Sequence, residues 1–142
     1  MDPGPLGTLG VGAPFAVAAQ LAHPGRRVVI VYGDGSFGLN GFEFDTAVRF
    51  KLPIIGVLGN DAAWGQMMRP QGAIYGWDRL AATELAYTRY DKVVEALGGH
   101  GEFVERPEQL RPALDRAAAS GKPALVNVII RQDKAYKGGI YV

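Results

Sequence analysis

The chain has 142 residues, of which 48% are hydrophobic and 20% charged, with a formal net charge of +1. This size and composition are typical of one globular domain with a buried core. The near-neutral charge gives no reason to expect nucleic-acid binding. Cysteine is absent, which excludes disulfides, thiolate metal sites and a cysteine nucleophile. No apolar stretch reaches about 18 residues and no signal-like segment begins the chain, so we expect a cytoplasmic protein without a membrane partner.

The first elements predicted in chain order are a helix and a strand. Residues 1–12 are too rich in glycine and proline for a regular element. A helix is predicted over residues 13–22, where Pro14 suits the first turn. Residues 27–32 form a continuous apolar run, which is typical of a strand covered on both faces.

A strand–helix–strand unit is predicted next. Residues 33–36, Gly-Asp-Gly-Ser, indicate a turn after the first strand. A helix is predicted over residues 41–51, and Pro53 separates it from a second strand over residues 54–58. Such a unit places two parallel strands in one sheet through a right-handed crossover. Residues 64–78 show no clear period and are predicted to be irregular.

The second half of the chain continues the alternation of helix and strand. The predicted elements are a helix over 89–97, a short strand over 102–105, a helix over 106–119, a strand over 124–130 and an extended tail over 131–142. Alternation throughout predicts a three-layer α/β fold, with a mostly parallel sheet and helices on both faces. No linker or repeat divides the sequence, so residues 1–142 are expected to form one domain.

Glycine is unusually frequent in this chain, with 20 residues, and it clusters beside the predicted strands. Such clusters indicate a backbone that approaches a ligand closely or takes a positive φ. Ordinary turn chemistry would explain any single cluster equally well. Several clusters at the strand ends favour a ligand site.

Two aspartates follow the first two predicted strands directly. Asp34 lies in Gly-Asp-Gly-Ser and Asp61 in Gly-Asn-Asp, so both are placed at the carboxyl edge of a parallel sheet, where ligands bind. Carboxylates and phosphate oxygens are ligands that Mg²⁺ prefers, and the amides of Gly35 and Ser36 could bind an anion. The pair therefore predicts a metal-bridged diphosphate, although either aspartate alone would more simply be a turn or capping residue. The sequence contains neither GxxxxGK[ST] nor a GxGxxG after the first strand, which disfavours the nucleoside-triphosphatase and dinucleotide alternatives.

Residues 33–55, GDGSFGLNGFEFDTAVRFKLPII, and residues 59–66, GNDAAWGQ, resemble the cofactor signature of thiamine-diphosphate-dependent enzymes. In that signature, GDG is followed after some two dozen residues by an Asn-Asn or Asn-Asp pair. Residues 3–20, PGPLGTLGVGAPFAVAAQ, are similar to the segment that precedes it. The resemblance covers essentially the whole chain. It implies the fold of the pyrophosphate-binding (PP) domain found in acetolactate synthases, benzaldehyde lyase and 2-hydroxyacyl-CoA lyases.

The resemblance implies a set of cofactor ligands. Mg²⁺ would be bound by the side chains of Asp34 and Asp61 and by the carbonyl of Ala63. The common form of the signature has asparagine where this chain has Asp61, which retains a ligand oxygen and adds negative charge. Thiamine diphosphate would contact Gly7, Thr8, Leu9, Gly33, Asp34, Gly35, Ser36, Asp61, Ala63, Trp64 and Gly65.

Several of these residues have more specific implied roles. The resemblance implies that Leu9 supports the bent cofactor from below and that the carbonyl of Gly7 accepts a hydrogen bond from its aminopyrimidine. The amides expected to face the diphosphate belong to Gly35, Ser36, Trp64 and Gly65. Substrate would be selected by Gln66 and Met67, which fall where family members line the substrate pocket.

The function implied by the resemblance is that of a C–C bond lyase or carboligase that uses thiamine diphosphate and Mg²⁺. The group it resembles most is 2-hydroxyacyl-CoA lyase, which cleaves 2-hydroxyacyl-CoA to formyl-CoA and an aldehyde or ketone, or runs in reverse. The alternatives are an acetolactate-synthase-like enzyme acting on 2-oxo acids and a noncatalytic dimerisation or regulatory module.

The activating glutamate of the family lies on a separate pyrimidine-binding (PYR) domain. No segment of this chain resembles that domain, so no catalytic residue is expected here. We expect the PYR domain to come from a partner chain or from a missing N-terminal part, within a dimer or tetramer. The other expected partner is the substrate, an acyl-CoA or a 2-oxo acid.

Overall fold

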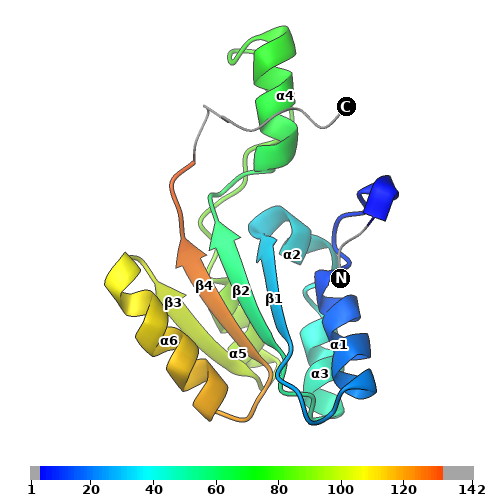
Figure 1. Ribbon diagram of the computed structural model, residues 1–142. Helices are drawn as coiled ribbons and strands as arrows, with labels where there is room; N and C mark the ends of the chain where they lie inside the picture. The colour runs from blue at the N-terminus through cyan, green and yellow to red at the C-terminus, as the bar shows by residue number, and fades with distance from the viewer. Residues whose placement is uncertain (1–3, 133–142) are drawn as a thin grey trace.

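The computed structural model describes residues 4–132, which contain a parallel four-stranded sheet of order β1-β2-β4-β3. The strands are β1 (Val29–Gly33), β2 (Ile55–Asn60), β3 (His100–Val104) and β4 (Ala124–Ile129). Every neighbouring pair is parallel. The carboxyl ends of the strands therefore lie at one edge of the sheet (Figure 1).

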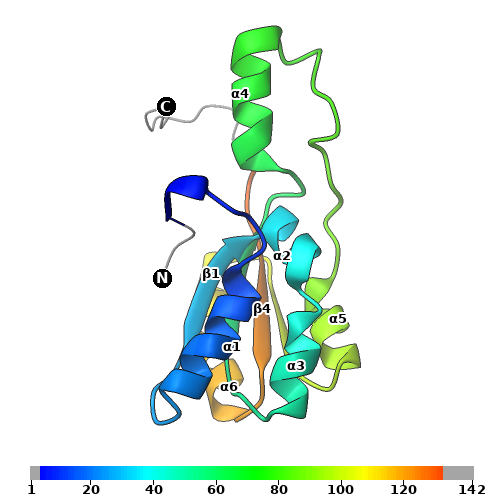
Figure 2. The same ribbon diagram turned by 90° about the vertical axis from the view of Figure 1, so that its right-hand side faces the viewer.

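Helices pack on both faces of the sheet, which confirms the predicted α/β class. The helical elements are η1 (Gly4–Leu6), α1 (Gly12–Ala22), α2 (Asp34–Asn40), α3 (Glu43–Arg49), α4 (Gly65–Tyr75), α5 (Tyr90–Ala96) and α6 (Pro107–Ala119). One face carries α1, α2, α3 and α5, and the other carries α6 (Figures 1 and 2). No helix within residues 4–132 is long and apolar enough to cross a membrane.

The alternation of side chains along the strands divides the core into two parts. Fully buried Phe44, Ile54 and Leu58 belong to the larger part, between the sheet and the four helices. Val104 and Val126 belong to the smaller part, beneath α6. Burying each large side chain stabilises the fold by about 1.5–3 kcal/mol, so these two layers hold the strand ends in place.

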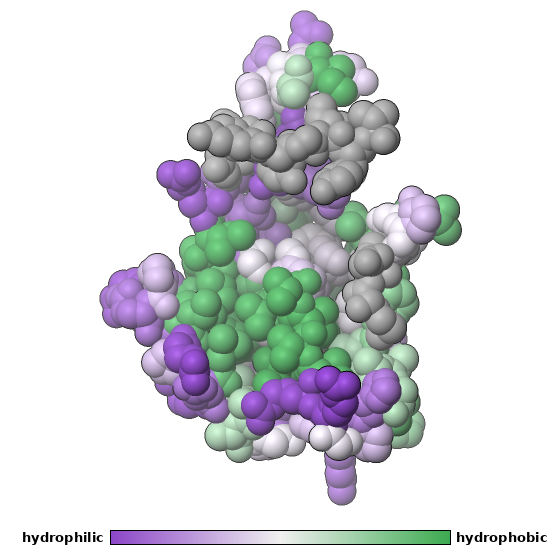
Figure 3. Space-filling model, viewed as in Figure 1, coloured by the Kyte–Doolittle hydropathy of each residue, from purple (hydrophilic) through white to green (hydrophobic). Residues whose placement is uncertain are grey.

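The second face of β1 is not covered by α6. Val29 is 53% exposed and Val31 is 80% exposed, and Figure 3 shows a hydrophobic area over this part of the sheet. We call the surface formed by Val29 and Val31 the β1 outer face. The expectation of a strand covered on both faces is therefore wrong for β1 within the described residues, because α6 packs mainly on β3 and β4.

The segment Gly-Asp-Gly-Ser was predicted to be a turn, but it forms the first turn of α2. Gly33 is extended (φ −87°, ψ 166°), and the helix begins at the next residue. Asp34 in the first turn suits the positive end of the helix. The helix stops at Gly41, where the Phe37 ring lies within 2.6 Å of the position that a Cβ would occupy, and α3 then begins separately.

Residues 64–78 were predicted to be irregular, but most of them form α4, which contains Pro70. The buried residues of α4 are Met68 and Gly72, and the Trp77 ring packs against the backbone at Gly72. Packing of this kind outweighs the low helix propensity of proline and glycine. As a result, α4 extends beyond the carboxyl edge of the sheet (Figures 1 and 2).

The remaining predicted elements are present with small shifts at their ends. Helix α6 begins with Pro107, and Gln109 Oε1 accepts the amide hydrogens of Glu105 and Arg106. The short η1 turn lies in the glycine-rich start, where no regular element was expected. Most of the predicted extended tail, residues 133–142, lies outside the described part of the chain.

Candidate functional site

A cavity of about 610 Å³ opens at the carboxyl ends of β1 and β2, a size typical of small-molecule sites. It brings together four separate parts of the chain. The predicted site residues that line it are Thr8, Leu9, Gly33, Asp34, Gly35, Ser36, Asp61, Ala63, Trp64, Gly65, Gln66 and Met67. Gly7 does not line the cavity, although its neighbour Thr8 does.

Asp34 is the most unusual polar group in this cavity. The residue is 1% exposed. Its Oδ1 accepts the Gly35 amide hydrogen at 3.0 Å, and its Oδ2 has no hydrogen-bond partner within residues 4–132. Burial, with a smaller contribution from the charge of Asp61, raises the pKa of Asp34 to about 6. The two carboxylates are thus close enough to repel each other, and a bound cation would relieve that repulsion.

Two glycines allow a close approach around these carboxylates. A Cβ at Gly65, the first residue of α4, would lie 2.9 Å from Asp61 Oδ2. A Cβ at Gly35 would lie 2.7 Å from the indole ring of Trp64. Any side chain at either position would therefore displace the Asp61 carboxylate or the indole.

The turn that carries Asp61 and Ala63 is fixed by its own backbone. Ala62 has a positive φ of 55°, and its amide donates to Asn60 Oδ1 at 3.2 Å. The Ala62 carbonyl accepts from the Leu85 amide at 2.7 Å, and Ala63 pairs with Glu84 in an isolated bridge. The turn is thus held from the strand side and from the loop that precedes α5.

The Trp64 amide was expected to bind the diphosphate, but it already has an acceptor in the protein. It donates to the Thr83 carbonyl at 2.8 Å, because that loop runs alongside the turn. The expectation that this amide faces a diphosphate therefore needs correction. Gly65 remains suited to the role, since first-turn amides of a helix such as α4 have no acceptor within the helix.

The N-terminal segment reaches the same cavity. Leu9 is half-buried and lines the cavity. The next residue, Gly10, donates its amide hydrogen to Ser36 Oγ at 3.0 Å. Gly10 has a φ of +82°, and a Cβ there would lie 2.7 Å from Leu39 Cβ. Only glycine fits this connection between the segment and α2.

Some lining residues were not predicted from the sequence. Arg69 lines the cavity from α4, with its guanidinium close to Gly65, and Ile130 lines it from the end of β4. Arg69 was missed because residues 64–78 were predicted to be irregular. A helix predicted over this segment would have placed Arg69 one turn after Gly65, on the same side.

The donor atoms of this site fit a hard divalent cation. No group of three or more His, Cys, Asp or Glu side chains that could hold a metal occurs within residues 4–132. Two carboxylates, a backbone carbonyl and the oxygens of a bound ligand would form the coordination shell that Mg²⁺ prefers. Oδ2 of Asp34, buried and without a hydrogen-bond partner among the described residues, is the atom that such an ion would satisfy.

Comparison with known proteins identifies the class to which this fold and site belong. Residues 1–128 match the family described as thiamine pyrophosphate enzyme, C-terminal TPP binding domain. The chain therefore belongs to the family of thiamine-diphosphate-dependent enzymes.

Individual relatives have different activities. A probable acetolactate synthase of Mycobacterium bovis is 51% identical over 136 residues, which are 96% of this chain and 25% of that protein. The 2-hydroxyacyl-CoA lyase 2 of Caenorhabditis elegans is 45% identical over 148 residues, covering 100% of this chain and 23% of that protein. This chain thus spans about a quarter of the length of these relatives.

A solved structure has the same fold. The thiamine diphosphate-dependent 4-hydroxybenzoylformate decarboxylase of Rhodococcus jostii RHA1 superposes with a TM-score of 0.83 and is 28% identical. The match covers 92% of this chain and 24% of that one. It confirms the expected fold and the membership of a family of enzymes.

Proposed function

We propose that the cavity binds the diphosphate of thiamine diphosphate through Mg²⁺, with Asp34, Asp61 and the Ala63 carbonyl as the protein ligands. The observation that carries this proposal is the buried and unpartnered Oδ2 of Asp34 beside a second carboxylate. Burying a charge in this way is costly unless an ion or a donor completes its interactions. The family match supplies the identity of the ligand.

The chain's own residues would bind and orient the cofactor. When bound, thiamine diphosphate supplies a carbon nucleophile that attacks carbonyl groups and accepts the electron pair of a broken C–C bond. In this proposal, Gly35 and Gly65 admit the diphosphate and Leu9 supports the cofactor from below. Arg69 adds positive charge beside the anionic ligand.

The proposed site needs a further domain for catalysis. Asp34 and Asp61 are the only carboxylates among the described residues that line the cavity, and both are assigned to the metal. A carboxylate that activates the pyrimidine would then come from a PYR domain, as the family resemblance implies. The β1 outer face supports this proposal, because an apolar surface of this kind commonly packs against more polypeptide.

Two substrate classes are proposed for the assembled enzyme. The first is the 2-hydroxyacyl-CoA lyase reaction, supported by relatives such as the lyase of Caenorhabditis elegans. The second is an acetolactate-synthase-like reaction on 2-oxo acids, supported by the 51% identity to the mycobacterial protein. Gln66 and Met67 are exposed on the first turn of α4 and line the cavity, so they are the proposed specificity residues.

Cofactor binding can be tested through tryptophan fluorescence, because Trp64 lines the cavity. Thiamine diphosphate would be titrated into the chain with Mg²⁺, with EDTA, and with Mg²⁺ after adding a PYR-bearing partner. We expect quenching that requires the metal and becomes stronger with the partner. The matched control is Trp64→Phe, which retains Trp77 and should lose the signal. Equal binding in EDTA would contradict the metal assignment.

The substrate class can be tested by product analysis of the assembled enzyme. Formyl-CoA with an aldehyde or ketone would be compared with pyruvate at equal concentrations. Formation of a 2-hydroxyacyl-CoA supports the lyase, and formation of acetolactate supports the synthase. Turnover by the purified chain alone would contradict the proposed requirement for a PYR domain.

A further inference from the structure

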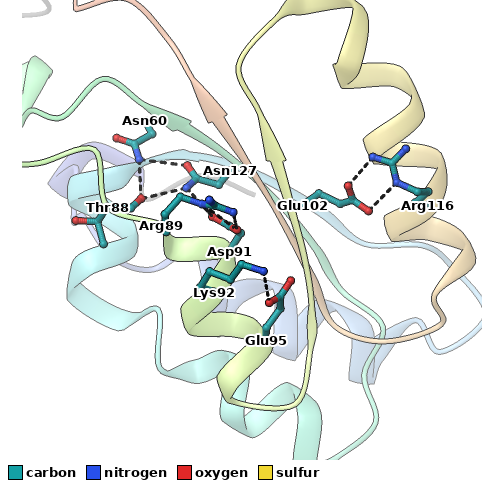
Figure 4. A network of polar contacts seen from close by, with 9 residues as sticks. All are labelled: Asn60, Thr88, Arg89, Asp91, Lys92, Glu95, Glu102, Arg116 and Asn127. Carbon is teal, nitrogen blue, oxygen red and sulfur yellow. Dashed lines mark hydrogen bonds and ion pairs between the residues drawn. The ribbon is translucent and has the colours of Figure 1, made fainter.

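A buried polar network is joined to the turn that carries Asp61 and Ala63, and Figure 4 shows its side chains. Its centre is formed by Asn60 at the end of β2, Asn127 in β4 and Asp91 in α5. Asn60 and Asn127 are 0% exposed and Asp91 is 1% exposed. None of the three lines the cavity, so the proposed cofactor contacts do not explain them.

The hydrogen bonds of this network use every polar atom of the two amides. Asn60 Nδ2 donates to the Thr88 carbonyl at 3.0 Å and to Asn127 Oδ1 at 3.2 Å. Asn127 Nδ2 donates to the same carbonyl at 3.1 Å and to Asp91 Oδ1 at 3.1 Å. Since every donor meets an acceptor, only one orientation of each amide satisfies the network.

The outer end of the network is anchored by Arg89. Its guanidinium binds both oxygens of Asp91, the shortest distance being 2.6 Å from Nη2 to Oδ2. It also lies 3.9 Å above the centre of the Phe103 ring. The bidentate pair and the aromatic contact limit the rotation of Asp91.

The inner end of the network reaches the turn that carries the proposed metal ligands. With its amide nitrogen committed to Thr88 and Asn127, Asn60 presents Oδ1 to the Ala62 amide hydrogen at 3.2 Å. That bond closes the turn over Asp61 and supports the positive φ of Ala62. Residues near Thr88 hold the same turn from outside, through Thr83 and Leu85.

We propose that Asp91 and Asn127 are positioning residues, which act through Asn60 to hold the Asp61 carboxylate and the Ala63 carbonyl in place for the metal. The role toward the metal rests on the proposed function. The geometric part, fixation of the turn by Asp91 and Asn127, can be measured without any ligand. Interactions behind a metal site commonly change its affinity by about 10–100-fold.

The chain offers a matched control for this proposal. Glu102 also pairs with an arginine, since Arg116 Nε and Nη2 donate to its two oxygens at 2.9 and 2.6 Å. This pair lies between β3 and α6 (Figure 4), and the described partners of Glu102, Arg116 and His100, lie outside the turn. Asp91→Asn and Glu102→Gln therefore make the same carboxylate-to-amide change, inside and outside the network.

The experiment compares three variants of the full chain, Asp91→Asn, Asn127→Ala and Glu102→Gln, by native-state amide exchange measured with NMR. The reporters are the amides of Ala62, Trp64 and Leu85, which hold the turn. We expect about tenfold faster exchange at these amides in the first two variants, and no local change in Glu102→Gln. Mg²⁺-dependent binding of thiamine diphosphate should weaken by about tenfold in the same two variants.

The outcomes separate positioning from general stability. Unchanged exchange at the turn in Asp91→Asn, or the same change in Glu102→Gln after correction for unfolding free energy, would overturn the proposal. Faster exchange with unchanged metal affinity would also overturn the role toward the metal. If the unmodified chain binds no cofactor even with its PYR-bearing partner, the proposed function fails, whereas the exchange data still decide whether Asp91 and Asn127 fix the turn.

Discussion

Asp34 and Asp91 are both 1% exposed, yet their pKa values are shifted in opposite directions. Burial alone would raise the pKa of Asp91, but hydrogen bonds from Arg89 and Asn127 hold it below its usual range. Burial also raises the pKa of Asp34, and the nearby Asp61 charge adds to the effect, giving a value of about 6. One carboxylate is satisfied by protein partners, and the other retains an unpartnered oxygen.

The difference in hydrogen-bond partners distinguishes a structural carboxylate from one suited to bind a ligand. Asp91 lies in a network whose donors and acceptors match, so its charge contributes to stability. Asp34 lies at the carboxyl edge of the sheet, where its charge opposes folding until a cation binds. The following predictions change one side of this comparison at a time.

The largest effect is expected for Asp34→Asn on cofactor binding. The amide keeps the shape of the carboxylate but lacks the charge that the metal needs, so Mg²⁺-dependent thiamine diphosphate binding should weaken by about 100-fold. Calorimetric titration of the chain with its PYR-bearing partner measures this change. Ser120→Ala, which removes a polar group at the end of α6 away from the cavity, is the control. Unchanged binding in Asp34→Asn would remove Asp34 from the metal site.

The same substitution should stabilise the chain in the absence of ligand, in a pH-dependent way. Because the folded pKa of Asp34 lies above its unfolded value, its contribution to stability is complete below about pH 4 and is lost as pH rises through about 6. The total loss is about 2–3 kcal/mol. In urea unfolding from pH 4 to 8, the unfolding free energy of Asp34→Asn should therefore rise relative to that of the unmodified chain. A constant difference would contradict the raised pKa.

Asp91→Ala, in contrast, should destabilise the chain. This change removes one of the two acceptors of the fully buried Asn127 Nδ2 and releases Arg89, so unfolding free energy should fall by about 2 kcal/mol at pH 7. The cost is moderated because Arg89 is half-exposed and can return to water. Urea denaturation measures it. Stabilisation by Asp91→Ala would remove the contrast with Asp34.

A smaller effect is expected for Gly65→Ala. The added Cβ would lie 2.9 Å from Asp61 Oδ2, so the carboxylate must move and metal affinity should fall by about tenfold. Stability should change little, because alanine favours the helix that begins there. Gly25→Ala, with no heavy atom within 4 Å of its Cβ, is the control for both measurements.

The placement of Asp34 could be predicted from the sequence, but the network around Asp91 could not. The strand–helix–strand unit predicted that Asp34 and Asp61 lie at one edge, because connected parallel strands end side by side. The partners of Asp91 could not be predicted, since Asn60 and Asn127 are 67 residues apart in the sequence. The one local signal was an asparagine in the apolar segment Ala124–Ile129, where a buried polar group requires partners.

The structural errors of prediction have local causes. Proline and glycine in residues 64–78 suggested an irregular segment, but packing of Trp77 on Gly72 allows α4. Gly-Asp-Gly-Ser suggested a turn, because glycine has low helix propensity, but Asp34 and the strand end fix the start of α2. Both errors concern helices that border the cavity, where tertiary packing outweighs local propensity.

The smallest effect is expected for Glu102→Gln, which tests whether pairing with arginine is enough to make a carboxylate important. Arg116 lowers the pKa of Glu102, chiefly through its hydrogen bonds, so this carboxylate stabilises the fold above its unfolded pKa and loses that effect as pH falls. Arg116 is 58% exposed, however, and water screens the pair. Glu102→Gln should therefore reduce unfolding free energy at pH 7 by less than Asp91→Ala does, and the difference from the unmodified chain should vanish in acid. An equal loss in the two variants would mean that the arginine pair, and not the buried amide network, accounts for the contribution of Asp91.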